Sequence, residues 1–215
     1  GKSMLQRVYE RARSSRRLER IIIATDDLRI FEAAQALGAE TWMTPVNLNS
    51  GTERAAEVAK KTDSPIVINI QGDEPLIKGQ MIDDLVQALQ DDTIPMATLA
   101  TKKKDLSLFG DKNIVKVVID KEGFALYFSR SPLPYQPSDY FWQHIGIYGY
   151  QRNFLLKFCN LPDSRLEKEE RLEQLRALEN GYRIKVLEAS YAPLSIDIPQ
   201  DIIMVENILK KESHD

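Results

Sequence analysis

The chain has 215 residues, and 29 Lys and Arg stand against 32 Asp and Glu, which leaves a formal net charge of -3. Apolar residues make up 43% and charged residues 28%, as in soluble globular proteins and unlike disordered or collagen-like chains. This charge argues against a globally basic nucleic-acid binder, and no apolar run approaches the roughly 20 residues that a membrane span needs. The single cysteine, Cys159, cannot form an internal disulfide, which favours a reducing cytoplasm.

Helices and strands are predicted to alternate through the first half of the chain. Apolar residues at helical spacing predict helices over residues 3–14, 28–37, 53–61 and 78–90. Short apolar runs predict strands over 21–24, 40–43, 66–70 and 96–101. This alternation is typical of an α/β fold with a mostly parallel central sheet and helices on both faces. In such sheets ligands bind beyond the carboxyl ends of the strands.

The second half has a different pattern. Residues 115–119 and 125–129 flank a turn that contains Gly123, which predicts a β-hairpin. After an aromatic loop over 135–142, further strands are predicted over 145–150 and 184–188, and helices over 153–158, 168–178 and 199–211. We expect this half to be a smaller mixed or antiparallel extension of the sheet, within a single domain over residues 1–215.

Two aspartates, one at the end of a predicted strand and one in a loop, are candidate metal ligands. Asp73 follows a predicted buried strand, and Asp197 precedes a helix whose first position is Pro199. Together they would suit Mg²⁺ bound to a nucleotide triphosphate, because Mg²⁺ takes few protein oxygens and completes its shell with phosphates. Each aspartate alone can also be a helix-capping residue.

Other candidates are weak one at a time. The segment 50–54 (SGTER) opens a predicted helix, where backbone N–H groups bind anions, or it is an ordinary capping segment. His144, Gly146 and Tyr148 fall on one face of a predicted strand and leave a slot at the glycine, although a lone histidine in a strand is more often structural. Arg130 ends a strand and can bind a carboxylate or form a surface salt bridge.

Three further features receive structural interpretations. Glu173 and Gln174 lie in a predicted helix with Leu172 and Leu175. Both polar residues are then either solvated or line a neighbouring pocket, and the pattern alone favours the solvated position. Cys159 has no histidine motif around it, so we interpret it as structural. The basic cluster over residues 11–17 is interpreted as a solvated helix end.

Taken together, the order of these motifs and their residue sequences resemble those of the 3-deoxy-manno-octulosonate cytidylyltransferases, or CMP-Kdo synthetases. The resemblance extends over nearly the whole chain. Its matching blocks are Gln6–Ala12, Ala24–Asp27, Ser50–Arg54, Asn69–Ile77, Val115–Val118, Ala125–Arg130, His144–Tyr148 and Leu172–Arg176.

The resemblance implies a Rossmann-like nucleotidyltransferase fold, a homodimer, and Mg²⁺-dependent transfer of CMP from CTP to the anomeric hydroxyl of Kdo for lipopolysaccharide biosynthesis in the cytoplasm. It implies that Asp73 and Asp197 are catalytic metal ligands. The implied nucleotide-binding residues are Lys2, Ser50, Gly51, Thr52, Arg54 and Gln71. The implied sugar-binding residues are Arg130, His144, Tyr148, Glu173 and Gln174. The implied partners are CTP and Kdo, with no nucleic acid and no membrane.

The chain departs from the family pattern at two places. The family opens with an apolar strand and a loop that grips the triphosphate, and here only the closing Gly1-Lys2 of that element is present. We therefore expect that the strand and most of the loop are missing, and that this 215-residue segment alone does not turn over CTP. Ile198 and Gln200 stand where the family has Thr and Glu, which removes a hydroxyl and a charge beside Asp197 and leaves Asp201 as a second candidate ligand.

Two alternatives stay open at this point. One is a cytidylyltransferase for another acidic sugar, such as the 8-amino analogue of Kdo or a sialic acid, because one pocket substitution can change sugar specificity. The other is a non-catalytic protein that binds a nucleotide without transferring it.

Overall fold

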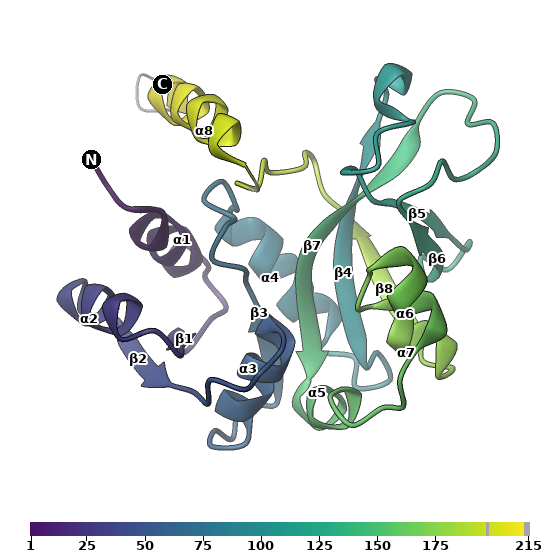
Figure 1. Cartoon of the computed structure of the whole chain (residues 1–215). Coiled ribbons are helices and arrows are strands. Elements are labelled where there is room, and N and C mark those ends of the chain that lie inside the picture. Colours follow the sequence, from purple (N-terminus) through teal and green to yellow (C-terminus); the bar gives the residue numbers. More distant parts are fainter. Residues whose placement is uncertain (197, 213–215) are drawn as a thin grey trace. The chain divides into compact units, whose positions relative to one another are not determined.

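The computed structural model describes residues 1–196 and 198–212, and contacts divide the chain into two compact units (Figure 1). The first unit contains residues 1–47, 70–83 and the described residues from 193 onward. The second unit contains residues 48–69 and 84–192. The single domain expected from the sequence stays a prediction, and each unit is described by itself.

The first unit contains a two-stranded parallel sheet. Its elements are α1 (Met4–Arg13), β1 (Ile22–Thr25), α2 (Leu28–Ala36), β2 (Glu40–Met43), the beginning of α4 (Gly79–Ala88), and α8 (Pro199–Glu212). β1 pairs with β2, and α2 connects them, as the alternation predicts for a parallel pair. The Asp27 side chain accepts the Arg29 N–H and caps α2, and Gly38 follows the helix at a φ of 72°.

A buried carboxylate holds the turn that follows α1. Asp83, in α4, accepts hydrogen bonds from the Ser15 hydroxyl at 2.5 Å and from the N–H groups of Arg16 and Arg17 at 3.0 and 3.1 Å. The backbone of the basic cluster over residues 11–17 therefore binds a buried carboxylate. The interpretation of this cluster as a solvated helix end did not predict that contact. Gly79 allows the same approach, because a Cβ there would lie 2.5 Å from the Ser14 carbonyl carbon.

The second unit contains a six-stranded sheet with the order β6-β5-β7-β4-β8, and β3 also pairs with β7. The strands are β3 (Ile66–Asn69), β4 (Met96–Lys103), β5 (Lys116–Ile119), β6 (Ala125–Ser129), β7 (Phe141–Gln151) and β8 (Ile184–Glu188). Of its five pairings, only β4 with β8 is parallel among the described residues. The expected mostly parallel central sheet is therefore wrong for this unit.

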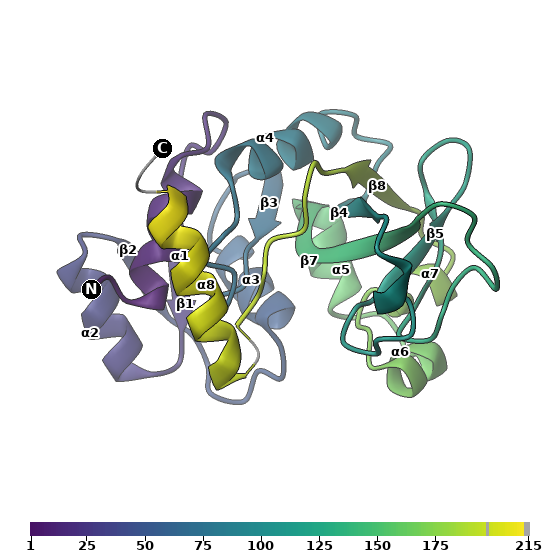
Figure 2. The ribbon, with the colours of Figure 1, turned by 90° about the horizontal axis from the view of Figure 1, so that it is seen from above.

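The long strand β7 is the reason for this difference. It runs antiparallel to both β3 and β4 and lies between them (Figure 2). β3 and β4 therefore point in the same direction, as the strand–helix–strand pattern predicts, but they are not neighbours. An alternating pattern in the first half of a chain cannot reveal a strand inserted from the second half.

The helices of this unit are α3 (Gly51–Ala59), α5 (Arg152–Phe158), α6 (Arg165–Glu170) and α7 (Leu175–Glu179), with a 3-10 turn over Leu106–Leu108. α3 and α5 contact each other and β3, and their apolar residues join a buried cluster with Tyr150 and Phe158. The continuous helix predicted over 168–178 is wrong: Arg171 adopts a left-handed conformation with φ 55° and separates α6 from α7. No helix among the described residues has the length and apolar character needed to cross a membrane.

Substitution of Gly79 by alanine tests the close approach beside Ser14. Helix propensity alone favours alanine by about 1 kcal/mol. We expect the opposite sign, a loss of about 1–3 kcal/mol in the free energy of unfolding, because the added Cβ would contact backbone atoms that cannot rotate away. Denaturant unfolding measures this, with Gly110→Ala as the control, since a Cβ at Gly110 meets nothing within 4 Å. A Gly79→Ala protein as stable as the parent would contradict this packing.

Candidate active site

In the first unit, the predicted metal aspartate lies beside the chain segment that leads to its predicted partner. Asp73 is half-buried, and its carbonyl oxygen accepts the Ile196 N–H at 3.0 Å. Asp197 is the next residue, and it lies outside the described residues. The Asp201 carboxylate accepts the N–H of Ile198 at 3.0 Å, as a residue at a helix start does.

Two predicted nucleotide residues also belong to the first unit. Lys2 is exposed, and its Nζ lies 2.6 Å from Glu10 Oε2. An exposed ion pair of this kind contributes little to stability, so Lys2 can exchange Glu10 for another anion. Gln71 is half-buried in the segment that contains Asp73.

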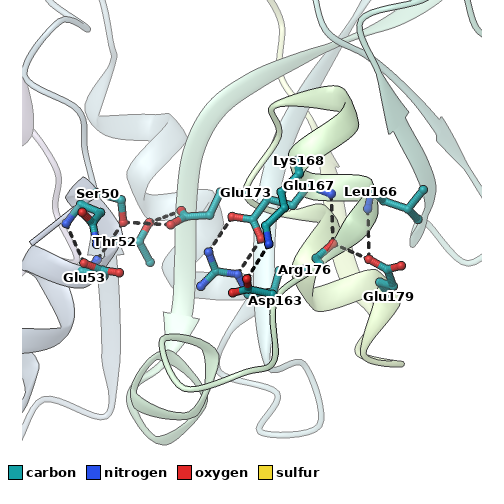
Figure 3. Close-up of polar contacts among 12 residues, drawn as sticks. Ser50, Thr52, Glu53, Asp163, Leu166, Glu167, Lys168, Glu173, Arg176 and Glu179 are labelled. Carbon is teal, nitrogen blue, oxygen red and sulfur yellow. Dashed lines mark hydrogen bonds and ion pairs between the residues drawn. The ribbon is translucent and has the colours of Figure 1, made fainter.

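In the second unit, a carboxylate is bound at the beginning of α3 (Figure 3). The Ser50 hydroxyl donates to Glu173 Oε1 at 2.9 Å, and the Thr52 hydroxyl donates to Glu173 Oε2 at 2.5 Å. Ser50 also caps α3, because its oxygen accepts the Glu53 N–H at 3.2 Å. A negative charge is favourable at a helix N-terminus. The solvated position that the pattern favoured for Glu173 is therefore wrong.

The chain places Glu173 by interrupting a helix. The left-handed Arg171 turns the backbone, and residues 172–174 connect α6 to α7. Arg176 on α7 binds Glu167 on α6 through two hydrogen bonds of 2.7 and 2.6 Å. The Ser164 hydroxyl, at the start of α6, also binds the Glu179 carboxylate (Figure 3). These contacts fix the corner that carries Glu173.

A stripe of aromatic side chains on β7 continues from this carboxylate. Tyr150 shares a hydrogen bond with Thr52. Its ring centroid lies 6.2 Å from that of Tyr148, which lies 5.5 Å from that of His144. Residues predicted for the nucleotide side and the sugar side therefore lie in one connected cluster, and Gly51 and Arg54 lie in the adjoining first turn of α3.

A bulge in β7 brings His144 and Tyr148 together. The pairing moves from Leu99 opposite Ile145 directly to Thr98 opposite Tyr148, so Gly146 and Ile147 have no paired partner on β4. In a regular strand, residues four apart are separated by about 13 Å. The bulge shortens this distance, and the two rings contact each other. A Cβ at Gly146 would meet no atom within 4 Å, which agrees with the open position expected there. That a ligand fills this position stays a prediction.

Burial keeps this aromatic stripe uncharged at neutral pH. It lowers the pKa of His144 to about 3 and raises the pKa of both Tyr148 and Tyr150 well above the usual range. The nearby Glu173 charge raises the pKa of Tyr150 further. Burial also raises the pKa of the Cys159 thiol to about 11, which agrees with its structural interpretation.

Gln174 offers a buried donor. Its side chain is 4% exposed, so the solvated position favoured by the pattern is wrong for Gln174 as well. Within the described part of the chain, its Nε2 atom has no hydrogen-bond partner. A buried amide without a partner is costly, and such groups gather at sites that a ligand or water completes.

Arg130 is held in place by backbone groups. Its guanidinium donates to the carbonyl oxygens of Glu170 at 3.1 Å, Lys112 at 3.2 Å and Arg171 at 3.5 Å. The fully buried Lys116 donates to the backbone carbonyls of Asp111, Ile114 and Arg130, the last at 2.9 Å. A guanidinium has five N–H donors, so these contacts leave donors for an anion.

Three residues of the site were not predicted from the sequence: Thr98, Tyr150, and Lys116, which binds the Arg130 carbonyl. Thr98 left a signal, because it is the one hydroxyl residue in the otherwise apolar run Met96–Ala100. Tyr150 also left one, since it lies two positions after Tyr148 on the same strand. The only sequence signal for the bulge that orients Tyr148 is Gly146.

Comparisons with known proteins show which family the chain resembles. A cytidylyltransferase family model matches residues 1–185. The 3-deoxy-manno-octulosonate cytidylyltransferase of Syntrophotalea carbinolica is 45% identical over 98% of this chain and 89% of its own length. The enzyme of that name from Solibacter usitatus is 48% identical over 98% of this chain and 85% of its own.

Solved structures show the same relationship. A CMP:2-keto-3-deoxy-manno-octonic acid synthetase complexed with CTP is 38% identical and superposes with a TM-score of 0.94, over 99% of this chain and 89% of that one. A 4-diphosphocytidyl-2C-methyl-D-erythritol synthase from Anaerococcus prevotii, 18% identical with a TM-score of 0.65 over 98% of this chain and 87% of its own, shares the fold alone. With these identities over nearly its full length, the chain belongs to the family of 3-deoxy-manno-octulosonate cytidylyltransferases.

Proposed function

We propose that this chain transfers CMP from CTP to the anomeric hydroxyl of Kdo, with release of pyrophosphate, for lipopolysaccharide biosynthesis. Its relatives support this reaction by their names and identities. One observation of the site carries the proposal: Glu173 binds the Ser50 and Thr52 hydroxyls and lies in the same cluster as Tyr148 and His144. This cluster joins the residues expected for the nucleotide to those expected for the sugar.

The reaction needs little covalent chemistry from the protein. The anomeric hydroxyl attacks the α-phosphorus, and pyrophosphate leaves in line, so the protein mainly positions the reactants and balances charge. The first turn of α3, with Gly51, Thr52 and Arg54, would bind the cytidine. The Gln174 amide would donate to a sugar oxygen, and the remaining N–H donors of Arg130 would bind the sugar carboxylate.

Asp73 and Asp197 are the proposed Mg²⁺ ligands. Carboxylate oxygens suit this hard cation. The hydrogen bond from the Ile196 N–H to the Asp73 carbonyl joins the segment that precedes Asp197 to Asp73. Among the described residues, no three His, Cys, Asp or Glu side chains form a metal-binding group, and Mg²⁺ on a triphosphate does not require three. A bound Mg²⁺ would offset phosphate charge. Homodimeric assembly and a cytoplasmic location stay predictions from the resemblance.

Pyrophosphate release with CTP and Kdo tests the reaction. We expect the natural protein that contains this chain to release pyrophosphate only when both CTP and Kdo are present. Transfer to a sialic acid but not to Kdo would contradict the proposed substrate. CTP binding without transfer to any acidic sugar would contradict the enzyme.

Asp73→Asn tests the metal assignment. The change keeps the size of the side chain and removes its charge, so we expect Mg²⁺-dependent CTP affinity, measured by calorimetry, to fall about tenfold or more. We expect pyrophosphate release by the natural protein that contains this chain to fall by about 100-fold or more. Asp92→Asn, at an exposed carboxylate, is the control and leaves both unchanged. Unchanged CTP affinity and release in Asp73→Asn would rule out this role.

Glu173→Gln tests the contact with α3. It replaces a charged acceptor of two hydroxyl donors, so we expect the free energy of unfolding to fall by about 1–2 kcal/mol and the affinities for CTP and Kdo to fall together. The control is Glu169→Gln, because Glu169 is exposed and lies 3.8 Å from Arg165 in a long ion pair. A variant that loses Kdo affinity alone, at unchanged stability and CTP affinity, would contradict a structural contact with α3.

A further inference from the structure

A buried hydroxyl lies behind the His144 ring. Thr98 is fully buried, in the middle of the apolar strand β4. Its Oγ1 lies 2.9 Å from the carbonyl oxygen of Ile147, 3.2 Å from that of Ile145, and 3.0 Å from Nε2 of His144. Three polar partners therefore surround one hydroxyl.

The single proton of the Thr98 hydroxyl determines which atom donates in the hydrogen bond between Thr98 and His144. A hydroxyl has one proton to donate, and carbonyl oxygens only accept. The Thr98 proton therefore points to the carbonyls of Ile145 and Ile147, and an Oγ1 lone pair faces Nε2 of His144. If the hydroxyl donated to Nε2 instead, Oγ1 would face two carbonyl oxygens with no proton between them. Nε2 must then be the donor.

The bulge in β7 makes this arrangement possible. Because Gly146 and Ile147 have no paired partner on β4, the carbonyls of Ile145 and Ile147 both lie within reach of Thr98. The low pKa of His144 agrees with a neutral ring. A neutral ring with its proton on Nε2 has a lone pair on Nδ1, and Nδ1 has no hydrogen-bond partner within the described part of the chain.

We propose that Thr98 is a positioning residue that holds His144 in the Nε2–H tautomer, so that Nδ1 is an acceptor for a hydroxyl group of the sugar. This inference rests on the proposed function, because it assigns His144 to the sugar. It also determines which sugar group His144 can bind: a lone pair accepts from a hydroxyl and repels a carboxylate. The sugar carboxylate must then bind elsewhere.

Nitrogen NMR of the chain labelled with ¹⁵N-histidine reads the tautomer directly. The chain has two histidines, so a His214→Gln variant assigns the signals. For His144 we expect a protonated, pyrrole-type Nε2 and an unprotonated, pyridine-type Nδ1. The proton on Nδ1, or on both nitrogens, at neutral pH would overturn the proposal. The spectrum is recorded without substrate, so it decides the tautomer independently of CMP transfer.

Thr98→Val removes the hydroxyl and keeps the shape of the side chain. We expect its His144 spectrum to show both tautomers, and its affinity for Kdo in the presence of CTP to fall roughly three- to tenfold, the size expected for one hydrogen bond. Thr98→Ser keeps the hydroxyl and should keep both the single tautomer and the Kdo affinity. This variant still tests the role of the hydroxyl if Thr98→Val folds poorly. The matched control is Thr101→Val, at another buried threonine of β4.

A Thr98→Val protein that keeps the Nε2–H tautomer and the parent affinity would overturn the role of Thr98. Failure of the parent chain to bind Kdo would contradict the proposed function, and with it the sugar contact of His144. The spectra of the parent and Thr98→Val chains would still show whether Thr98 sets the tautomer, so the two failures are distinguishable.

Discussion

The contact between the Glu173 carboxylate and the first turn of α3 is the interaction on which the site depends. Two hydroxyls bind its two oxygens, and the helix N-terminus favours its charge. The same contact ties the corner between α6 and α7 to the helix expected to bind cytidine. Because Thr52 also reaches Tyr150, the contact extends to the aromatic stripe of β7. One carboxylate therefore connects elements that lie far apart in the sequence.

Around this charge the second unit places neutral polar groups. Burial lowers the pKa of His144 to about 3 and raises that of Tyr148 well above its usual range, so the ring and the phenol act as neutral hydrogen-bonding groups. Such groups suit the many hydroxyls of a sugar, since each can be matched by geometry. Arg130, the cation expected for the sugar carboxylate, has its guanidinium held by three carbonyls, and its own carbonyl binds the buried Lys116.

Much of the local structure was predictable from the sequence, and most of the pairing was not. The β1–α2–β2 pattern follows from apolar spacing, and the structure confirms it. The place of β7 between β3 and β4 depends on contacts distant in sequence, which no local pattern encodes. The break at Arg171 has no glycine or proline to mark it, so Glu173 was predicted in solvent. The resemblance named Ser50, Thr52 and Glu173 together because it uses positions rather than local propensity, and these side chains contact one another.

A double-mutant cycle between Thr52→Val and Glu173→Gln, measured as CTP affinity by calorimetry, tests the central claim most directly. If the Glu173 carboxylate organises the nucleotide end of the site through Thr52, the two changes are not additive, and we expect a coupling energy of about 1–2 kcal/mol. Each single variant should then lose nearly as much affinity as the double variant. Effects that add to within about 0.5 kcal/mol would contradict the account, because Thr52 and Glu173 would then act on CTP independently.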